Sequence, residues 1–202
     1  MSKELSAAGF TVKSGWAAVV LLTLAGRTPR VMASRRVELS DPKLPDSRQP
    51  YHDGFGTARK EGAVLTRLLT AVQSFGRRSV NEALDDFEST GTTLAGAALV
   101  AGSLTDPETI SNEHIRIHAR EGQLFRRVIE DTVSSRGLAY EVCRERDLWK
   151  LASETIRIGE AALRSKIAAI DRTSDGPWRI EQKAATVAAW LLLAKRSAIG
   201  DR

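Results

Sequence analysis

The order of apolar segments along the chain restricts the fold more than any other feature of the sequence. Apolar stretches at residues 10–25 and 30–39, separated by a turn at 26–29, predict a pair of antiparallel strands. After a proline-containing loop at residues 40–56, helical periodicity and short apolar runs alternate. An antiparallel hairpin followed by alternating helices and strands predicts an α/β fold with a mixed sheet and flanking helices.

The later elements follow from spacing and from residues that begin or end helices. Asp147 and Pro177 suit helix starts. Gly122 lies inside a predicted helix, where glycine costs ~1 kcal/mol relative to alanine, so we expect it to face the sheet or a neighbouring helix closely. No repeat or low-complexity segment interrupts the chain, so we expect one α/β domain over residues 1–202. The predicted helices cover residues 57–89 (one long helix, or two joined near residues 74–76), 112–135, 147–170 and 178–197, and the later strands cover residues 92–101 and 138–145.

Charge and cysteine content narrow the classes of protein. The chain has a net charge of +5 and one cysteine, Cys143, so it forms no intrachain disulfide, and we expect a buried, inert thiol there. The longest apolar run, residues 16–22, is far shorter than a membrane span, and no signal peptide is evident, so we expect a cytoplasmic protein with no membrane partner. The basic balance favours an anionic partner such as nucleic acid, although arginines scattered among carboxylates are also typical of a solvated surface.

Three segments carry a family resemblance. Residues 9–17 (GFTVKSGWA) are similar to a first strand that typically reads Gly-Ile-Asp-x-Gly-x-x-x-x-Gly-Trp-Ala. Residues 94–145 match a strand–helix–strand unit, and residues 181–190 match a closing helix. Together they resemble the ribonuclease H-like superfamily, particularly the branch that contains the Holliday-junction resolvase RuvC. The resemblance implies a ribonuclease H-like fold and an association with nucleic acid.

The chain departs from that family in its acidic residues. Nucleases of this fold hold two divalent metal ions between carboxylates, and the metals activate water and stabilise the leaving oxygen. Thr11 or Val12 stands near the place of the first-strand aspartate, and Val100 or Ala101 near that of the middle-strand acid. Only Glu181 lies where the family's final carboxylates fall. With these departures, the resemblance implies binding or scaffolding of nucleic acid rather than cleavage.

A second pattern consists of histidines. His114 and His118 lie one turn apart on the predicted helix 112–135, with Glu121 on the same face. Two imidazoles and a carboxylate form half of a transition-metal site, and His52 from the loop is a candidate to complete it. Glu181 is a further carboxylate for such a metal or polar site. A divalent metal at these residues is therefore one interpretation, and a polar helix surface is the alternative. The sequence assigns no cofactor and no catalytic residue.

The same helix carries arginines that suit an anion. A helix start with nearby arginines favours phosphate. Glutamates and Asp131 alternate with these arginines, so ion pairs along a solvated helix are the alternative. The candidate anion-binding residues are Arg116, Arg120, Arg126 and Arg127.

Three functions remain open on this basis. The first is a nucleic-acid-associated, ribonuclease H-like protein without the usual carboxylates. The second is a metal-dependent hydrolase or nuclease that uses His114, His118 and Glu121. The third is a protein-interaction module, with homo-oligomerisation through the apolar helix 178–197.

Overall fold

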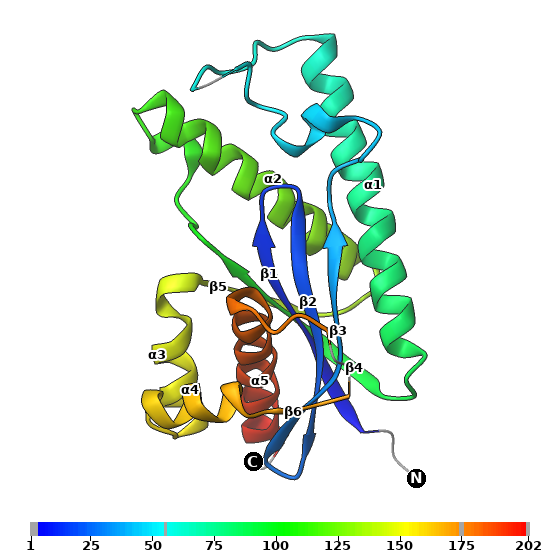
Figure 1. The fold of residues 1–202 in the computed structure, drawn as a ribbon, viewed down its shortest axis with the longest axis vertical. Helices are drawn as coiled ribbons and strands as arrows, with labels where there is room; N and C mark the ends of the chain where they lie inside the picture. Colours follow the sequence, from blue (N-terminus) through cyan, green and yellow to red (C-terminus); the bar gives the residue numbers. More distant parts are fainter. Residues whose placement is uncertain (1–3, 55, 174–175, 201–202) are drawn as a thin grey trace.

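The fold is a mixed α/β sheet with helices on both faces, as predicted. The computed structural model describes residues 4–54, 56–173 and 176–200. Six strands of this part of the chain form one sheet in the order β5-β4-β1-β2-β3-β6 (Figure 1). The strands are β1 (Leu5–Lys13), β2 (Trp16–Ala25), β3 (Thr28–Glu38), β4 (Thr93–Ala101), β5 (Tyr140–Arg144) and β6 (Asp171–Arg172). The helices are α1 (Ala63–Glu88), α2 (Glu113–Ser135), α3 (Glu145–Ile156), α4 (Glu160–Ala168) and α5 (Ile180–Gly200), with short 3₁₀ turns η1 (Pro45–Arg48) and η2 (Pro107–Thr109).

The opening antiparallel unit has three strands, so the prediction of one strand over residues 10–25 is wrong. The chain reverses at Ser14 and Gly15, and Lys13 of β1 pairs with Trp16 of β2. Gly15 has a φ of 79°, which glycine adopts without the steric cost that a side chain adds. Both strands are buried along most of their length, so apolar residues lie on either side of the short Ser14-Gly15 turn and the apolar pattern predicts a single strand.

The later strands are parallel to β1, as expected. β4 pairs with β1, β5 pairs with β4, and α2 forms the crossover between β4 and β5. Figure 1 shows α1 and α2 on one side of the sheet and α3, α4 and α5 on the other. Each side has its own buried core, one around Phe10, Leu99 and Phe125, the other around Val100 and Leu192.

The helix predicted over residues 147–170 is two helices. α3 ends where Arg157 adopts the left-handed conformation (φ 60°), and α4 begins at Glu160. Asp147 does not cap α3 as predicted, because Arg144 occupies the N-cap position and Asp147 forms an ion pair with it. α2 begins as expected, with the Asn112 side chain accepting a hydrogen bond from the Ile115 amide at 3.0 Å.

α5 lies against the centre of the sheet through an unusually close contact. A Cβ atom on Gly9 of β1 would lie 1.9 Å from the carbonyl oxygen of Ala185. The prediction that Gly122 makes such an approach is wrong, because Gly122 is exposed and no atom lies within 4 Å of a Cβ placed there. Gly9 is thus a glycine that the packing of α5 on β1 requires.

The apolar residues of α5 are used inside the chain. Ala185, Ala189 and Leu192 are among the α5 side chains buried against the sheet. The apolar residues of α5 therefore no longer give a reason to expect homo-oligomerisation through this helix. No helix of the described residues is both long and apolar enough to cross a membrane.

Candidate functional site

The ends of β1 and β4 meet the start of α5 at one end of the sheet. Thr11 is paired with Val100 in the parallel register, and its hydroxyl donates a hydrogen bond to the Glu181 carbonyl at 2.9 Å. Thr11 therefore faces α5, whereas Val12 faces the α1–α2 side. We call the region around Thr11, Lys13 and the first turn of α5 the sheet end.

The side chains at the sheet end do not form a carboxylate cluster. Thr11 is buried, and Lys13 forms an ion pair with Glu145, the first residue of α3, at 3.2 Å. Glu145 thus already has a cationic partner, and Glu181 lies in the first turn of α5. Two divalent ions repel each other strongly unless several carboxylates surround them, and the sheet end lacks that set.

Sequence reasoning missed the role of Glu145. The residue directly follows β5, whose end lies at the same edge of the sheet as those of β1 and β4 because the three strands are parallel. A charged residue at the carboxyl end of a parallel strand is the signal that would have found it.

The three histidines come together on the other side of the sheet. One ring nitrogen from each of His52, His114 and His118 lies within 4.8 Å of the other two. The Nε2 atoms of His114 and His118 are 3.2 Å apart, and the ring centroids of His52 and His118 are 4.7 Å apart. Burial, His52 and His114 lower the pKa of His118. We call these three residues the histidine cluster.

Glu121 forms the buried base of the histidine cluster. Its side chain is fully buried, and its Oε1 is 2.8 Å from Nδ1 of His52. Its Oε2 is buried without a hydrogen-bond partner and lies 3.9 Å from Nδ1 of His118. Burial raises the pKa of Glu121, and the hydrogen bond with His52 opposes that rise.

The loop that carries His52 is held in place by Arg59. The Arg59 guanidinium donates to the Pro50 carbonyl at 3.0 Å and forms ion pairs with Asp46 and Asp53. An isolated bridge between His52 and Ala58 closes the loop. His52 is thus presented to α2 by an internally bonded segment.

Glu181 does not belong to the histidine cluster, contrary to its grouping with the histidines in the sequence. It lies in the first turn of α5, which covers the opposite face of the sheet from α2. The crossover topology separates the two sets of residues, and sequence spacing does not reveal this separation.

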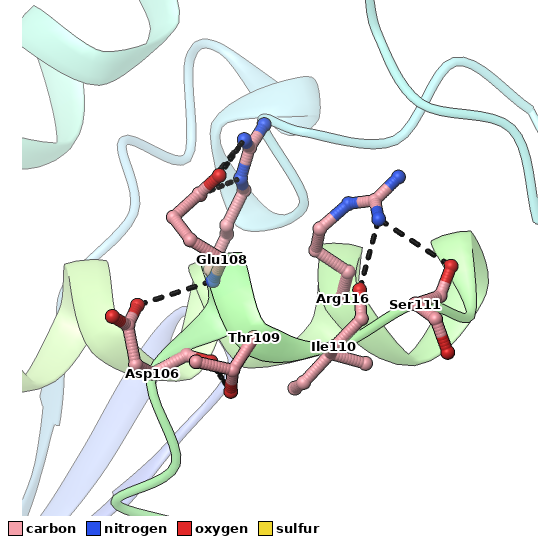
Figure 2. Close-up of polar contacts among 7 residues, drawn as sticks. Asp106, Glu108, Thr109, Ile110, Ser111 and Arg116 are labelled. Carbon is pink, nitrogen blue, oxygen red and sulfur yellow. Dashed lines mark hydrogen bonds and ion pairs between the residues drawn. The ribbon is translucent and has the colours of Figure 1, made fainter.

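Three of the four candidate anion-binding arginines have partners within the chain. Figure 2 shows Arg116 directed at the carbonyls of Ile110 and Ser111, with hydrogen-bond distances of 2.9 and 3.4 Å. Arg120 holds both carboxylate oxygens of Glu108. In the remaining two, Arg126 pairs with Glu130 at 2.9 Å, and Arg127 is exposed.

Comparison with known proteins identifies the fold. No family model matches the sequence, and no curated protein matches it either. The structure is similar to that of Thermus thermophilus RuvC, with a TM-score of 0.59 and 9% sequence identity over 96% of both chains. It is also similar to T. thermophilus RuvC in complex with a Holliday junction substrate, with a TM-score of 0.57 and 10% identity over 96% of both chains.

The chain has a RuvC-like, ribonuclease H-like fold. The resemblance seen in the sequence is thereby confirmed at the level of the fold, although identity near 10% carries no residue roles.

Proposed function

We propose that this protein binds nucleic acid at the sheet end without cleaving it. The observation that carries the proposal is the convergence of β1, β4 and α5, which brings Thr11 and the Lys13–Glu145 pair to the place where the family resemblance calls for carboxylates. The likeness of the fold to a RuvC that is solved with a Holliday junction supports nucleic acid as the ligand class.

Basic side chains around the sheet end support the same ligand. Arg48 contacts the turn at Gly15, where a Cβ would lie 2.7 Å from the Arg48 Cγ. Arg179 and Lys183 lie on either side of Glu181 at the start of α5, and Arg48 and Arg179 are exposed. Cations placed in this way neutralise phosphates, and the counterions that they release make such binding fall steeply with salt.

The binding test compares nucleic acids of different shape. Fluorescence anisotropy with labelled single-stranded, duplex and four-way-junction DNA should give affinities that fall as salt rises. Arg179→Gln and Lys183→Gln should each weaken binding and reduce the slope of log K against log salt by about one. Lys166→Gln is the matched control, since Lys166 is an exposed lysine of α4 and does not belong to β1 or to the first turn of α5.

Two results would contradict the binding proposal. The first is an affinity that does not change with salt. The second is an equal loss of binding in Lys166→Gln and Lys183→Gln, which would remove the sheet end as the interface.

The cleavage test uses the same substrates in magnesium or manganese. We expect no product from junction, duplex or RNA–DNA hybrid, because the sheet end does not offer the carboxylates that two metal ions require. Metal-dependent cleavage that Glu181→Gln abolishes would overturn the non-cleaving role and leave the binding proposal intact.

A further inference from the structure

We propose that His52, His114 and His118 bind one zinc-type transition-metal ion, and that Glu121 positions His52 for it. The site joins the loop before α1 to the first turns of α2. It lies on the opposite side of the sheet from α5, so the inference stands independently of nucleic-acid binding at the sheet end.

The spacing of the ring nitrogens fits tetrahedral coordination. Zinc–nitrogen bonds of about 2.0–2.1 Å at tetrahedral angles place two ligand nitrogens about 3.3 Å apart. The Nε2 atoms of His114 and His118 are 3.2 Å apart, and all three donor atoms lie within 4.8 Å.

Glu121 positions the His52 ring for a metal. Oε1 of Glu121 lies 2.8 Å from Nδ1 of His52, and in the tautomer in which Nδ1 donates to this carboxylate the lone pair of His52 is on Nε2. Metal-binding histidines commonly donate their second nitrogen to a carboxylate in this way. A fully buried glutamate whose Oε2 has no hydrogen-bond partner is costly, and the positive charge of a metal beyond His52 would offset part of that cost.

The donor set selects the class of metal. Imidazole nitrogens suit zinc, copper, nickel and iron, whereas magnesium and calcium require oxygen ligands. Glu121 is already engaged with His52, so no oxygen donor is added to the set. His114 and His118 are exposed, which leaves a fourth coordination position open to water or to an anionic ligand.

The chain is well suited to a direct test because it contains three histidines and one cysteine. Tag-free, full-length protein is stripped with a chelator and titrated with Co²⁺, followed by visible absorption, and then with Zn²⁺ in competition with a chromophoric chelator. We expect one ion per chain, tetrahedral cobalt bands, and reduced hydrogen exchange in residues 50–54 and 56–58 when zinc is bound.

Variants separate ligands from neighbours. His118→Ala and His114→Ala should each weaken zinc binding by about 100-fold or more, and Glu121→Gln, which keeps an acceptor for His52, by about 10–100-fold. Glu121→Gln should also alter the cobalt bands, which a loss of stability alone would not do. Cys143→Ser is the control and should bind as the unaltered protein does. Circular dichroism confirms that each variant is folded.

The alternative to a metal site is a hydrogen-bonded group of histidines, in which one Nε2 donates to the other. Absence of zinc, cobalt and nickel binding below about 100 μM would support that alternative and overturn the proposal. Equal binding by the protein and by His118→Ala would overturn it as well. Both measurements are made without nucleic acid, so their failure is distinguishable from failure of the proposed function.

Discussion

The sheet end and the histidine cluster use polar side chains in opposite ways. At the sheet end, the Thr11 hydroxyl donates to a backbone carbonyl and Lys13 pairs with Glu145. In the histidine cluster, three imidazoles crowd around Glu121, whose buried Oε2 has no hydrogen-bond partner. A buried polar atom without a partner lowers the stability of the fold, whereas a hydrogen bond or ion pair offsets the cost of burying a polar group. The buried carboxylate of the described chain that calls for a ligand is therefore Glu121 in the histidine cluster. It does not lie at the sheet end, where the family resemblance places the catalytic carboxylates.

The two regions should also differ in what a substitution changes. The sheet end is formed where α5 packs on β1, so substitutions at this contact should change the free energy of unfolding. The histidine cluster joins an internally bonded loop to an exposed part of α2, so substitutions there should change metal binding and leave the metal-free stability almost unaltered.

The largest expected effect is at Gly9. Gly9→Ala should lower the free energy of unfolding by about 3 kcal/mol or more, because its Cβ would lie 1.9 Å from the Ala185 carbonyl oxygen, which is backbone and must move. Gly122→Ala, next to Glu121, is the matched control: it has open space and should gain up to about 1 kcal/mol from helix propensity. Urea denaturation followed by circular dichroism measures both, and a Gly9→Ala protein as stable as Gly122→Ala would show that α5 does not sit closely on β1.

These two glycines illustrate what the sequence could predict about the fold. Apolar periodicity located α1 and α2 because each helix has one repeating buried face, and a continuous apolar run located β4, which is buried on both faces. It could not tell which glycine lies under another backbone, since that depends on how α5 crosses β1. It also missed the turn at Ser14 and Gly15, although a Ser-Gly pair is a turn signal, because the flanking strands are both fully buried.

The candidate sites were predictable to different degrees. The pairing of His114 with His118 follows from their spacing on one helix, and the structure brings Glu121 beneath them. The position of His52 depends on a loop held by Arg59, which no periodicity encodes. Glu181 was grouped with the histidines because both sets are polar, and only the topology shows that they lie on opposite faces.

A moderate effect is expected at Thr11. Thr11→Val keeps the shape of the side chain and removes the hydrogen bond to the Glu181 carbonyl, so it should cost about 1.5 kcal/mol. His114→Ala, measured with a chelator present, should change the free energy of unfolding by less than about 0.5 kcal/mol because the side chain is exposed. If the order of these two effects were reversed, the assignment of a stabilising role to Thr11 at the sheet end and of a metal-binding role to His114 in the histidine cluster would be wrong.

A smaller effect than that at Thr11 is expected at Cys143, and it sharpens the comparison because this residue is the one thiol of the chain and thiolates are soft metal ligands. Burial raises the pKa of Cys143 from 9.0 to about 11. A thiol with this pKa stays protonated at neutral pH and is a poor metal ligand and nucleophile, which leaves the histidines as the groups that select the metal.

The raised pKa of Cys143 also predicts how stability changes with pH. Below pH 9, both the native and the unfolded chain keep the thiol proton, so the residue contributes no pH dependence. Between pH 9 and about 11, the unfolded chain loses that proton while the native chain retains it, so the free energy of unfolding falls as pH rises.

Tyrosines and lysines titrate in the same range, and Cys143→Ser removes the cysteine contribution alone. The difference between the two proteins should therefore shrink by about 0.5–1 kcal/mol from pH 8 to pH 10, because partial exposure of Cys143 weakens the full effect of the shift. A constant difference across this range in urea denaturation would show that the thiol ionises as readily in the native state as in the unfolded chain, and Cys143 would then return as a candidate metal ligand.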